Sequence, residues 1–202
     1  MAKERTRNDM RSRIAHIAAR LMAEDGIEDH ALAKRKAARQ AGAPDSRQLP
    51  TNEEIDTALR TYQQLFGPNE HLLRVKQLRE KALKAMRQLE QFNPYLTGSV
   101  LTGSAGKYAD VDLQLFTDSV KALELYLIDR GIPYKASQRS IYSGEDPRTI
   151  PVFTINDGDI EIRIMVFSPS DLRLPLKTSP SGKSMERAKA QAVEALLAQD
   201  LL

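Results

Sequence analysis

The sequence contains no cysteine and no tryptophan, and aromatic residues make up only 5% of it. Without cysteine there is no disulfide scaffold, no thiolate zinc site and no cysteine nucleophile, so any metal must bind to oxygen or histidine. Few aromatic side chains leave little of the base-stacking surface that single-strand nucleic-acid binders use. No apolar run approaches the roughly 20 residues of a membrane span, and the polar start Met1–Asp9 does not resemble a signal peptide. We therefore expect a cytoplasmic protein with no membrane partner.

The composition that remains is that of a globular protein, with 202 residues of which 41% are hydrophobic and 28% charged. At about 100–200 residues per domain, this length allows one domain with a helical appendage or two small domains. Thirty Lys and Arg against 27 Asp and Glu give a net charge of +3, which is a weak sign of an anionic partner. The three histidines, His16, His30 and His71, do not have metal-ligand spacing.

The hydrophobic pattern changes at Asn93-Pro94. Before this point the apolar residues recur at helical spacing, and after it they also alternate with a period of two, as in strands. We predict an α+β protein with a helical N-terminal region over residues 1–93. The second region, 94–202, is predicted to form a small mixed sheet flanked by helices and to end in a C-terminal helix.

Four helices are predicted in the first region, over residues 10–25, 29–41, 52–66 and 70–91. Gly26 ends the first and Gly42 the second, while Thr51 and Glu54 have the spacing of a capping box for the third. The second of these helices is basic and rich in alanine.

In the second region Asp110–Phe116 alternates strictly, with Asp110, Asp112 and Gln114 on one face, and predicts a half-buried strand with its carboxylates outward. Asp118 is the expected N-cap of a helix over 119–130. Further strands are predicted over 134–142, 149–155 and Ile160–Phe167, with a hairpin turn at Asn156–Asp159. A loop over 168–184 and a last helix over Met185–Asp200 complete the prediction.

The residues with the clearest chemistry lie in Tyr95–Phe116. A glycine-serine pair at a strand end lets the backbone approach a phosphate while amide hydrogens and the hydroxyl donate to its oxygens, and Gly98-Ser99 is such a pair. After ten intervening residues, Asp110 and Asp112 share one strand face, at about the separation at which two carboxylates bind one divalent ion. Together these features suggest a triphosphate site.

These motifs resemble the signature of the DNA polymerase β-type nucleotidyltransferase superfamily, in particular its small minimal-nucleotidyltransferase branch. The resemblance implies a bacterial protein. The residues that match the signature as they stand are Gly98, Ser99, Gly103, Asp110, Val111 and Asp112, and the resemblance covers roughly residues 94–167. Gly103-Ser104 is a second candidate for the phosphate-holding pair, but the ten-residue gap favours the first.

The resemblance implies a third carboxylate on a later strand, which serves as a metal ligand or as a base. Glu161 is the candidate, with Asp159 as a weaker substitute. Arg163 occupies the other slot on the same face, and the triad is broken if the family position falls there.

The resemblance also implies a reaction, in which an acceptor hydroxyl attacks the α-phosphate of a nucleoside triphosphate and pyrophosphate leaves. Mg²⁺ or Mn²⁺ would bind to Asp110, Asp112 and Glu161. Lys107 is a candidate contact to the β- or γ-phosphate, and Lys135 and Arg139 are poorer ones. The acceptor stays open between a small molecule, a protein side chain and an RNA end.

Two alternatives come from other classes of protein. One is a catalytically inactive nucleotidyltransferase fold, used as a binding module or in a toxin–antitoxin pair. The other is a DNA-binding regulator, since Arg11–Gly26 is similar to the first helix of TetR-type repressors and Ala33–Gln40 is a basic run. The linker 43–50 falls where a recognition helix should follow, so duplex DNA is not among the expected partners.

Overall fold

The computed structural model describes residues 2–27, 29–43, 49–66, 68–143, 146–178 and 184–199, with side chains from residue 9 onward except those at 64, 66, 68 and 69. The chain is an α+β protein with a mixed seven-stranded sheet. Its contacts divide it into two compact units, Met1–Arg74 with Gly103–Ala109, and Val75–Thr102 with Asp110–Leu202. The domain limits expected from the change of period, 1–93 and 94–202, are a separate division and stay a prediction.

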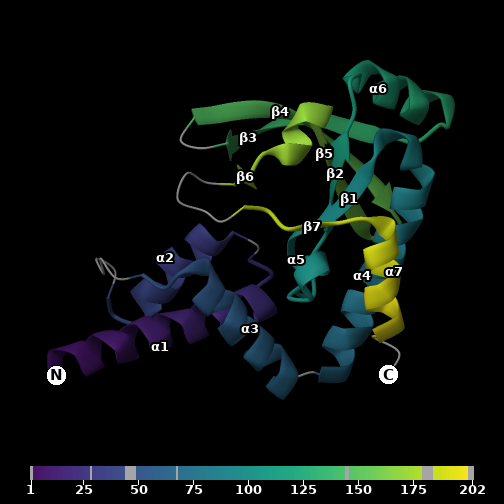
Figure 1. Ribbon diagram of the computed structural model, residues 1–202. Coiled ribbons are helices and arrows are strands. Elements are labelled where there is room, and N and C mark those ends of the chain that lie inside the picture. Colours follow the sequence, from purple (N-terminus) through teal and green to yellow (C-terminus); the bar gives the residue numbers. More distant parts are fainter. Residues whose placement is uncertain are drawn as a thin grey trace. The chain divides into compact units, whose positions relative to one another are not determined.

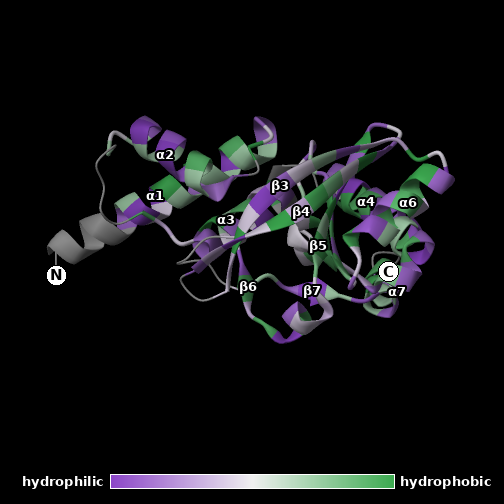
Figure 2. Cartoon of the chain, turned by 90° about the horizontal axis from the view of Figure 1, so that it is seen from above, coloured by the Kyte–Doolittle hydropathy of each residue, from purple (hydrophilic) through white to green (hydrophobic). Residues whose placement is uncertain are grey.

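The first unit is built on three helices, α1 (Ala2–Glu24), α2 (His30–Gln40) and α3 (Asn52–Phe66), and α1 packs against both of the others. Hydrophobic and hydrophilic residues alternate along α1 and α2 (Figure 2). The core between the helices contains many alanines beside Ile14, Leu21, Ile55 and Leu59. Small side chains let the helices approach closely, which explains how an alanine-rich segment forms a buried helix here.

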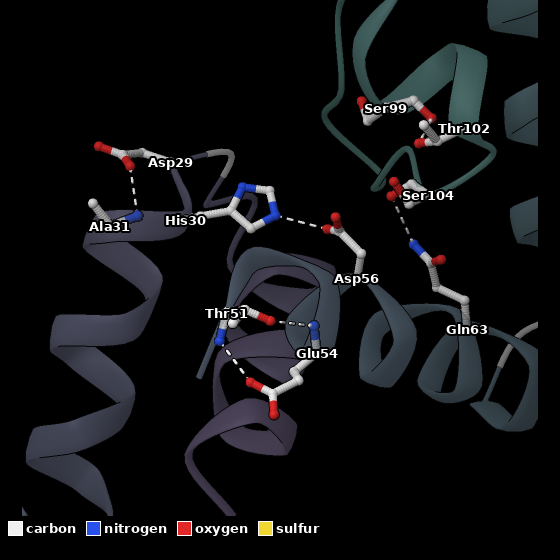
Figure 3. Close-up of polar contacts among 10 residues, drawn as sticks. All are labelled: Asp29, His30, Ala31, Thr51, Glu54, Asp56, Gln63, Ser99, Thr102 and Ser104. Atoms are coloured by element: carbon white, nitrogen blue, oxygen red, sulfur yellow. Dashed lines mark hydrogen bonds and ion pairs between the residues drawn. The ribbon is translucent and has the colours of Figure 1, made fainter. Parts of the chain in front are cut away.

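The ends of these helices follow the local sequence signals. The amide of Thr51 donates to the Glu54 carboxylate at 2.6 Å, and the amide of Glu54 donates to the Thr51 hydroxyl at 3.2 Å (Figure 3), so the predicted capping box is confirmed. The Asp29 carboxylate accepts from the amide of Ala31 at 2.7 Å and caps α2. The Arg11 guanidinium, which binds the same Glu54 carboxylate, holds the pKa of Glu54 below its ordinary value.

Two helix predictions need correction at their ends. The first helix begins at Ala2 rather than near residue 10, because residues 2–9 contain no helix breaker. The fourth helix, α4 (Pro68–Gln88), ends before residue 91, and Glu90–Phe92 forms the short 3₁₀ helix η1. Asn93 then adopts a left-handed conformation with φ of 51°, which turns the chain into the sheet.

The second unit holds the sheet, in the spatial order β6-β3-β4-β5-β2-β1-β7 (Figure 1). The strands are β1 (Pro94–Thr97), β2 (Val111–Phe116), β3 (Tyr134–Ser143), β4 (Asp146–Asp157), β5 (Ile160–Phe167), β6 (Leu176–Lys177) and β7 (Arg187–Ala188). Neighbouring strands are antiparallel except β2 and β5, which run parallel. The short α5 (Gly98–Thr102) follows β1, α6 (Val120–Asp129) follows β2, η2 (Pro169–Arg173) follows β5, and α7 (Ala190–Gln199) ends the described chain.

One face of this sheet is apolar and packs against helices. Val111, Leu113, Ile162 and Ile164 of the two central strands are almost completely buried on it. The second unit's part of α4 lies on this side with α6 and α7 (Figure 1), and Arg87 of α4 binds Glu194 of α7 at 2.8 Å. None of the helices in the described part of the chain has the length and apolar character needed to cross a membrane.

The opposite face, here called the site face, carries the other residues of each strand and has two different halves. Its apolar half is a second small core that includes Tyr95, Phe116, Met165 and Phe167, against which Leu172 and Met185 pack. Asp171 of η2 is buried beside this core and binds Arg148 of β4 at 2.7 and 2.9 Å. The other half of the site face is polar.

Several predictions in this region are corrected by the fold. Gln114 is fully buried under Met185 rather than solvated, because residues after β5 cover that part of the strand. The helix α6 is capped by Ser119, whose hydroxyl accepts from the amide of Ala122, and not by Asp118. The expected loop over 168–184 contains η2 and β6 in its described part.

The last helix begins at Ala190, five residues later than predicted, because Arg187–Ala188 pairs with the edge of β1 instead. Its predicted end, Asp200, lies outside the described residues. The strand predicted over 149–155 is longer, since β4 spans Asp146–Asp157, and the hairpin turn narrows to Gly158-Asp159. The predicted strand Ile160–Phe167 has the bounds of β5.

Candidate functional site

The polar half of the site face is a row of side chains that the strand register places next to one another. Asp112 of β2 pairs with Thr97 of β1 on one side and with Arg163 of β5 on the other. Beyond Arg163 the row continues to Thr154 of β4 and Lys135 of β3, and beyond Thr97 it reaches Arg187 of β7. Paired residues of neighbouring strands project to the same face, so this polar row crosses six strands.

An arginine occupies the centre of the row. The Nε atom of Arg163 donates to Oδ1 of Asp112 at 2.9 Å, and its Nη2 atom lies 3.4 Å from Oδ2 of the same carboxylate. The Nη1 atom lies 3.8 Å from Oδ2 of Asp110. The side chains of Asp110, Asp112 and Arg163 keep 23%, 19% and 29% of their surface exposed, so solvent ions have access to all three.

The glycine-serine turn lies directly against one of these carboxylates. Gly98 has a φ of +76°, and a Cβ atom placed on it would lie 3.0 Å from Oδ2 of Asp112. Glycine is favoured at such a position, because positive φ strains a residue with a side chain and because an added Cβ would press on the Asp112 carboxylate. The structure therefore brings Gly98-Ser99 and Asp112 together across β1 and β2.

A buried arginine that sequence reasoning missed positions this turn. Arg79 of α4 is buried, and its Nε and Nη2 atoms donate to the carbonyl oxygens of Val100 and Leu101 at 3.1 Å each. These bonds hold α5, which begins at Gly98. A signal was present in the sequence, since Arg79 falls on the same helical stripe as Val75, Leu78 and Ala82 and so projects toward the core.

Glu161 lies on the same face as Arg163, two residues earlier in β5, and it is exposed. Continuing the parallel register of β2 and β5 by one residue beyond Val111 and Ile162 sets Asp110 beside Glu161. Among the described residues, however, no three acidic or histidine side chains gather closely enough to hold a metal ion. The contacts that define this site are those of Arg163 with the two aspartates.

The donor set of the site is nevertheless suited to a hard divalent cation. The predicted strand begins at Val111 rather than at Asp110, so Asp110 lies just before β2, but its carboxylate contacts the same Arg163 guanidinium as that of Asp112. The bare Cα of Gly98 leaves space beside Asp112 that a side chain would fill. Magnesium is usually held by one or two carboxylates together with waters and phosphates. The Arg163 guanidinium now lies on the oxygens that such an ion would take.

Three further predicted site residues, Gly103, Ser104 and Lys107, belong to the first unit. The Ser104 carbonyl accepts from the Gln63 side chain (Figure 3). The Ala105 carbonyl accepts from the same side chain, and His71 bonds to the carbonyl of Gly103 at 2.9 Å. The Lys107 ammonium lies 5.4 Å from the centre of the Tyr108 ring. Their assignment to nucleotide binding stays a prediction. The role of Asp159, in the exposed β4–β5 turn, as a substitute third carboxylate also stays a prediction.

Comparisons with known proteins add the following. No protein-family model matches the chain, and no curated protein matches it. Among solved structures, a GLD-2/RNP-8 complex matches at 24% identity and a TM-score of 0.32 over 52% of this chain and 43% of that one. A cytoplasmic RNA terminal U-transferase matches at 20% identity and a TM-score of 0.30 over 48% of this chain and 34% of that one. This chain thus spans less than half the length of either, and likenesses of this size define no family for it.

Proposed function

We propose that the chain is a nucleotidyltransferase that moves a nucleoside monophosphate from a nucleoside triphosphate to an acceptor hydroxyl. The observation that carries the proposal is the contact of the Gly98-Ser99 turn with Asp112, beside Asp110 on one sheet face. A phosphate can approach the backbone of the turn, and the two carboxylates can bind the cation that accompanies it. The pairing of β1 with β2 brings these two features together.

The turn, Arg79 and the three carboxylates each have a part in this reaction. The Ser99 hydroxyl and the amides of the Gly98 turn donate to phosphate oxygens, while Arg79 keeps α5 in place through the carbonyls of Val100 and Leu101. Glu161 accepts the proton of the acceptor hydroxyl. Asp110 and Asp112 hold Mg²⁺ or Mn²⁺, which neutralises charge on the phosphates when it is bound.

The acceptor is the open part of the proposal. A small hydroxylated molecule, a protein side chain and an RNA end all provide a hydroxyl, and the exposed Glu161 is reachable by any of them. A bacterial origin and a cytoplasmic location stay predictions. If the chain transfers nucleotides, Asp110→Ala should abolish metal-dependent transfer. If the fold is instead an inactive binding module, the unchanged protein will show no transfer either.

Thermal unfolding tests the proposal. Mg²⁺ or Mn²⁺ together with a nucleoside triphosphate should raise the melting temperature, because ligands that bind only the folded state stabilise it. Asp112→Asn should remove most of that shift, whereas Asp129→Asn, which changes an exposed carboxylate at the end of α6, should leave it intact. If none of the four triphosphates raises the melting temperature, the enzyme assignment is wrong.

A second function, nucleic-acid binding by the helical unit, is favoured by one observation. Arg35, Lys36 and Arg39 are exposed on α2 at positions that share one side of the helix. The first unit holds fourteen of the basic and eleven of the acidic residues, so it carries the whole net charge of +3. Such a stripe suits a phosphate backbone.

Binding of the full chain to labelled RNA and to duplex DNA at rising salt tests this function. The double variant Arg35→Glu/Lys36→Glu should weaken binding and flatten its salt dependence. Charge reversal at Lys121 and Lys189 is the control, since both are exposed lysines of the other unit. Equal weakening in both variants would contradict a specific role of α2.

A further inference from the structure

Arg163 lies at the centre of the site, but the proposed transfer reaction does not use it. Its guanidinium lies across both aspartates, with one nitrogen 2.9 Å from Asp112 and another 3.8 Å from Asp110. The strand that carries it is paired in parallel with the strand of Asp112, residue against residue. The sheet therefore presents a cation at the place where a divalent ion would bind.

The guanidinium and a divalent ion cannot both occupy this place. Each needs the same carboxylate oxygens, and the two positive charges repel one another at contact distance. A divalent ion that binds Asp110 and Asp112 must therefore displace the Arg163 side chain. The Arg163 side chain can change its rotamer toward solvent while β5 stays in place, since 29% of its surface is exposed.

Binding of the divalent ion raises the charge that the site shows to an anion by two. Asp110, Asp112 and Arg163 together carry a net charge of −1, which repels a polyphosphate. With a divalent ion added, the same three residues and the ion carry +1, and the guanidinium is released from its carboxylates. Its donors form a planar fork that matches phosphate oxygens.

The next two positions of the polar row favour the same ligand. Thr154 and Lys135 follow Arg163 across β4 and β3, and they offer a hydroxyl and an ammonium on the same face of the sheet. Lys135 is exposed and Thr154 is half-buried. On this side of Arg163 the row contains no carboxylate to compete with a phosphate for the guanidinium.

We propose that Arg163 competes with the divalent ion for Asp110 and Asp112, and that the ion, once bound, releases the guanidinium to bind the triphosphate. This inference rests on the proposed function and adds a residue to it. Through Arg163, bound metal then increases the affinity for triphosphate, and bound triphosphate increases the affinity for metal. Arg163 is a ligand of the triphosphate in one state and a counterion of the aspartates in the other.

The first test measures the binding of Mn²⁺ alone, from the electron paramagnetic resonance signal of the free ion. Arg163→Met should bind Mn²⁺ roughly tenfold more tightly than the unchanged protein, a size typical of coupling between two ligands. Arg163→Lys should fall between the two, because it keeps the charge but loses the forked geometry. Lys135→Met removes an equal charge from the same row without touching the aspartates, so its Mn²⁺ affinity should stay within about twofold.

The second test measures binding of inorganic triphosphate by calorimetry at saturating Mn²⁺, which makes it independent of the base. Arg163→Met should bind this probe roughly tenfold more weakly, although it binds the metal more tightly. A merely structural role of Arg163 would not move the two affinities in opposite directions. Circular dichroism of each variant confirms that it is folded, and Arg163→Gln replaces Arg163→Met if the latter is not.

The outcomes separate this inference from the proposed function. If the unchanged protein binds Mn²⁺ and Arg163→Met binds it equally or more weakly, the competition is wrong while the metal site stands. If Arg163→Met binds metal more tightly but triphosphate unchanged, the release to phosphate is wrong. If neither protein binds Mn²⁺, the metal site of the proposed function fails, and the competition is refuted with it.

Discussion

The two halves of the site face are built from the same strands but have opposite characters. Along β2 the face reads Asp112, Gln114, Phe116, and along β5 it reads Arg163, Met165, Phe167. The later residues of both strands are covered by η2 and Met185 and form a core, whereas the earlier ones stay partly exposed and pair as ions. The boundary falls at Gln114, a polar residue with the burial of a core residue.

This difference shows that a two-residue period assigns residues to a face but does not say whether that face is covered. Covering depends on where a distant segment returns to the sheet. Here the chain after β5 folds back over one half of the face and leaves the other half to ion pairs, and the proposed site lies in that half.

The largest expected effect is on the apolar half. Phe167→Ala removes a ring that stacks on Phe116 with centroids 5.4 Å apart and leaves a cavity under η2. It should lower the free energy of unfolding by about 3–5 kcal/mol, measured by urea denaturation. Thr154→Ala in the polar row should cost less than about 1 kcal/mol. Similar losses in both variants would mean that the two halves do not differ as described.

A smaller effect is expected where η2 is held to β4. Arg148→Ala leaves the Asp171 carboxylate, whose side chain is 3% exposed, without its partner. The free energy of unfolding should fall by about 2 kcal/mol at neutral pH.

This loss should depend on pH. The hydrogen bonds from Arg148 to the Asp171 carboxylate lower the pKa of Asp171 below its ordinary value of 3.8. The stabilisation by the pair is thus present above that pH and is lost as the pH falls through the lowered pKa of the folded state. Acid titration of stability should make the unchanged protein and Arg148→Ala converge below pH 3.8, and a constant difference would show that Asp171 is not the group responsible.

The polar half can be disturbed through its glycine. Gly98→Ala should cost about 1–2 kcal/mol, because an alanine at positive φ is strained and its Cβ would press on Asp112. Gly131→Ala is the matched control, since Gly131 has a φ of +63° but no atom within 4 Å of the added Cβ. Only Gly98→Ala should also reduce the thermal stabilisation by metal and triphosphate. If both variants lose the same amount of thermal stabilisation by metal and triphosphate, the contact between the Gly98 turn and Asp112 has no role in ligand binding.

The smallest effect concerns the boundary residue. Oε1 of Gln114 is buried with no hydrogen-bond partner among the described residues, and its Nε2 atom donates only weakly, to the Met185 sulfur at 3.6 Å. Gln114→Met has nearly the same shape and should raise the free energy of unfolding by up to about 1 kcal/mol, measured in urea. A loss of stability would show that the amide is satisfied and belongs to the polar half.

The sequence was sufficient where structure depends on near neighbours. The capping box of Thr51 and Glu54, the bounds of α3 and β5, and the α+β class all follow from local spacing and period. The strand period also predicted that Asp110 and Asp112 lie together, and both contact Arg163, although β2 begins only at Val111.

What could not be predicted depends on register and on returning segments. Nothing local reveals that Arg163 is set against Asp112 rather than one residue away, yet that single step decides which cation lies on the carboxylates. The pairing of Arg187–Ala188 with β1 likewise depends on a strand that lies far earlier in the chain, and it takes the place of the first turn of the predicted last helix.

The parallel course of β2 and β5 has a consequence for redesign of the molecule. Since the two strands are direct neighbours, the placement of Arg163 beside Asp112 is set by the hydrogen bonds between them and not by the chain that joins them. That joining chain carries α6 and the β3–β4 hairpin. A reporter peptide grafted between α6 and β3 should therefore leave the alignment of the two strands unaltered, which offers a place to attach a probe without rebuilding the site.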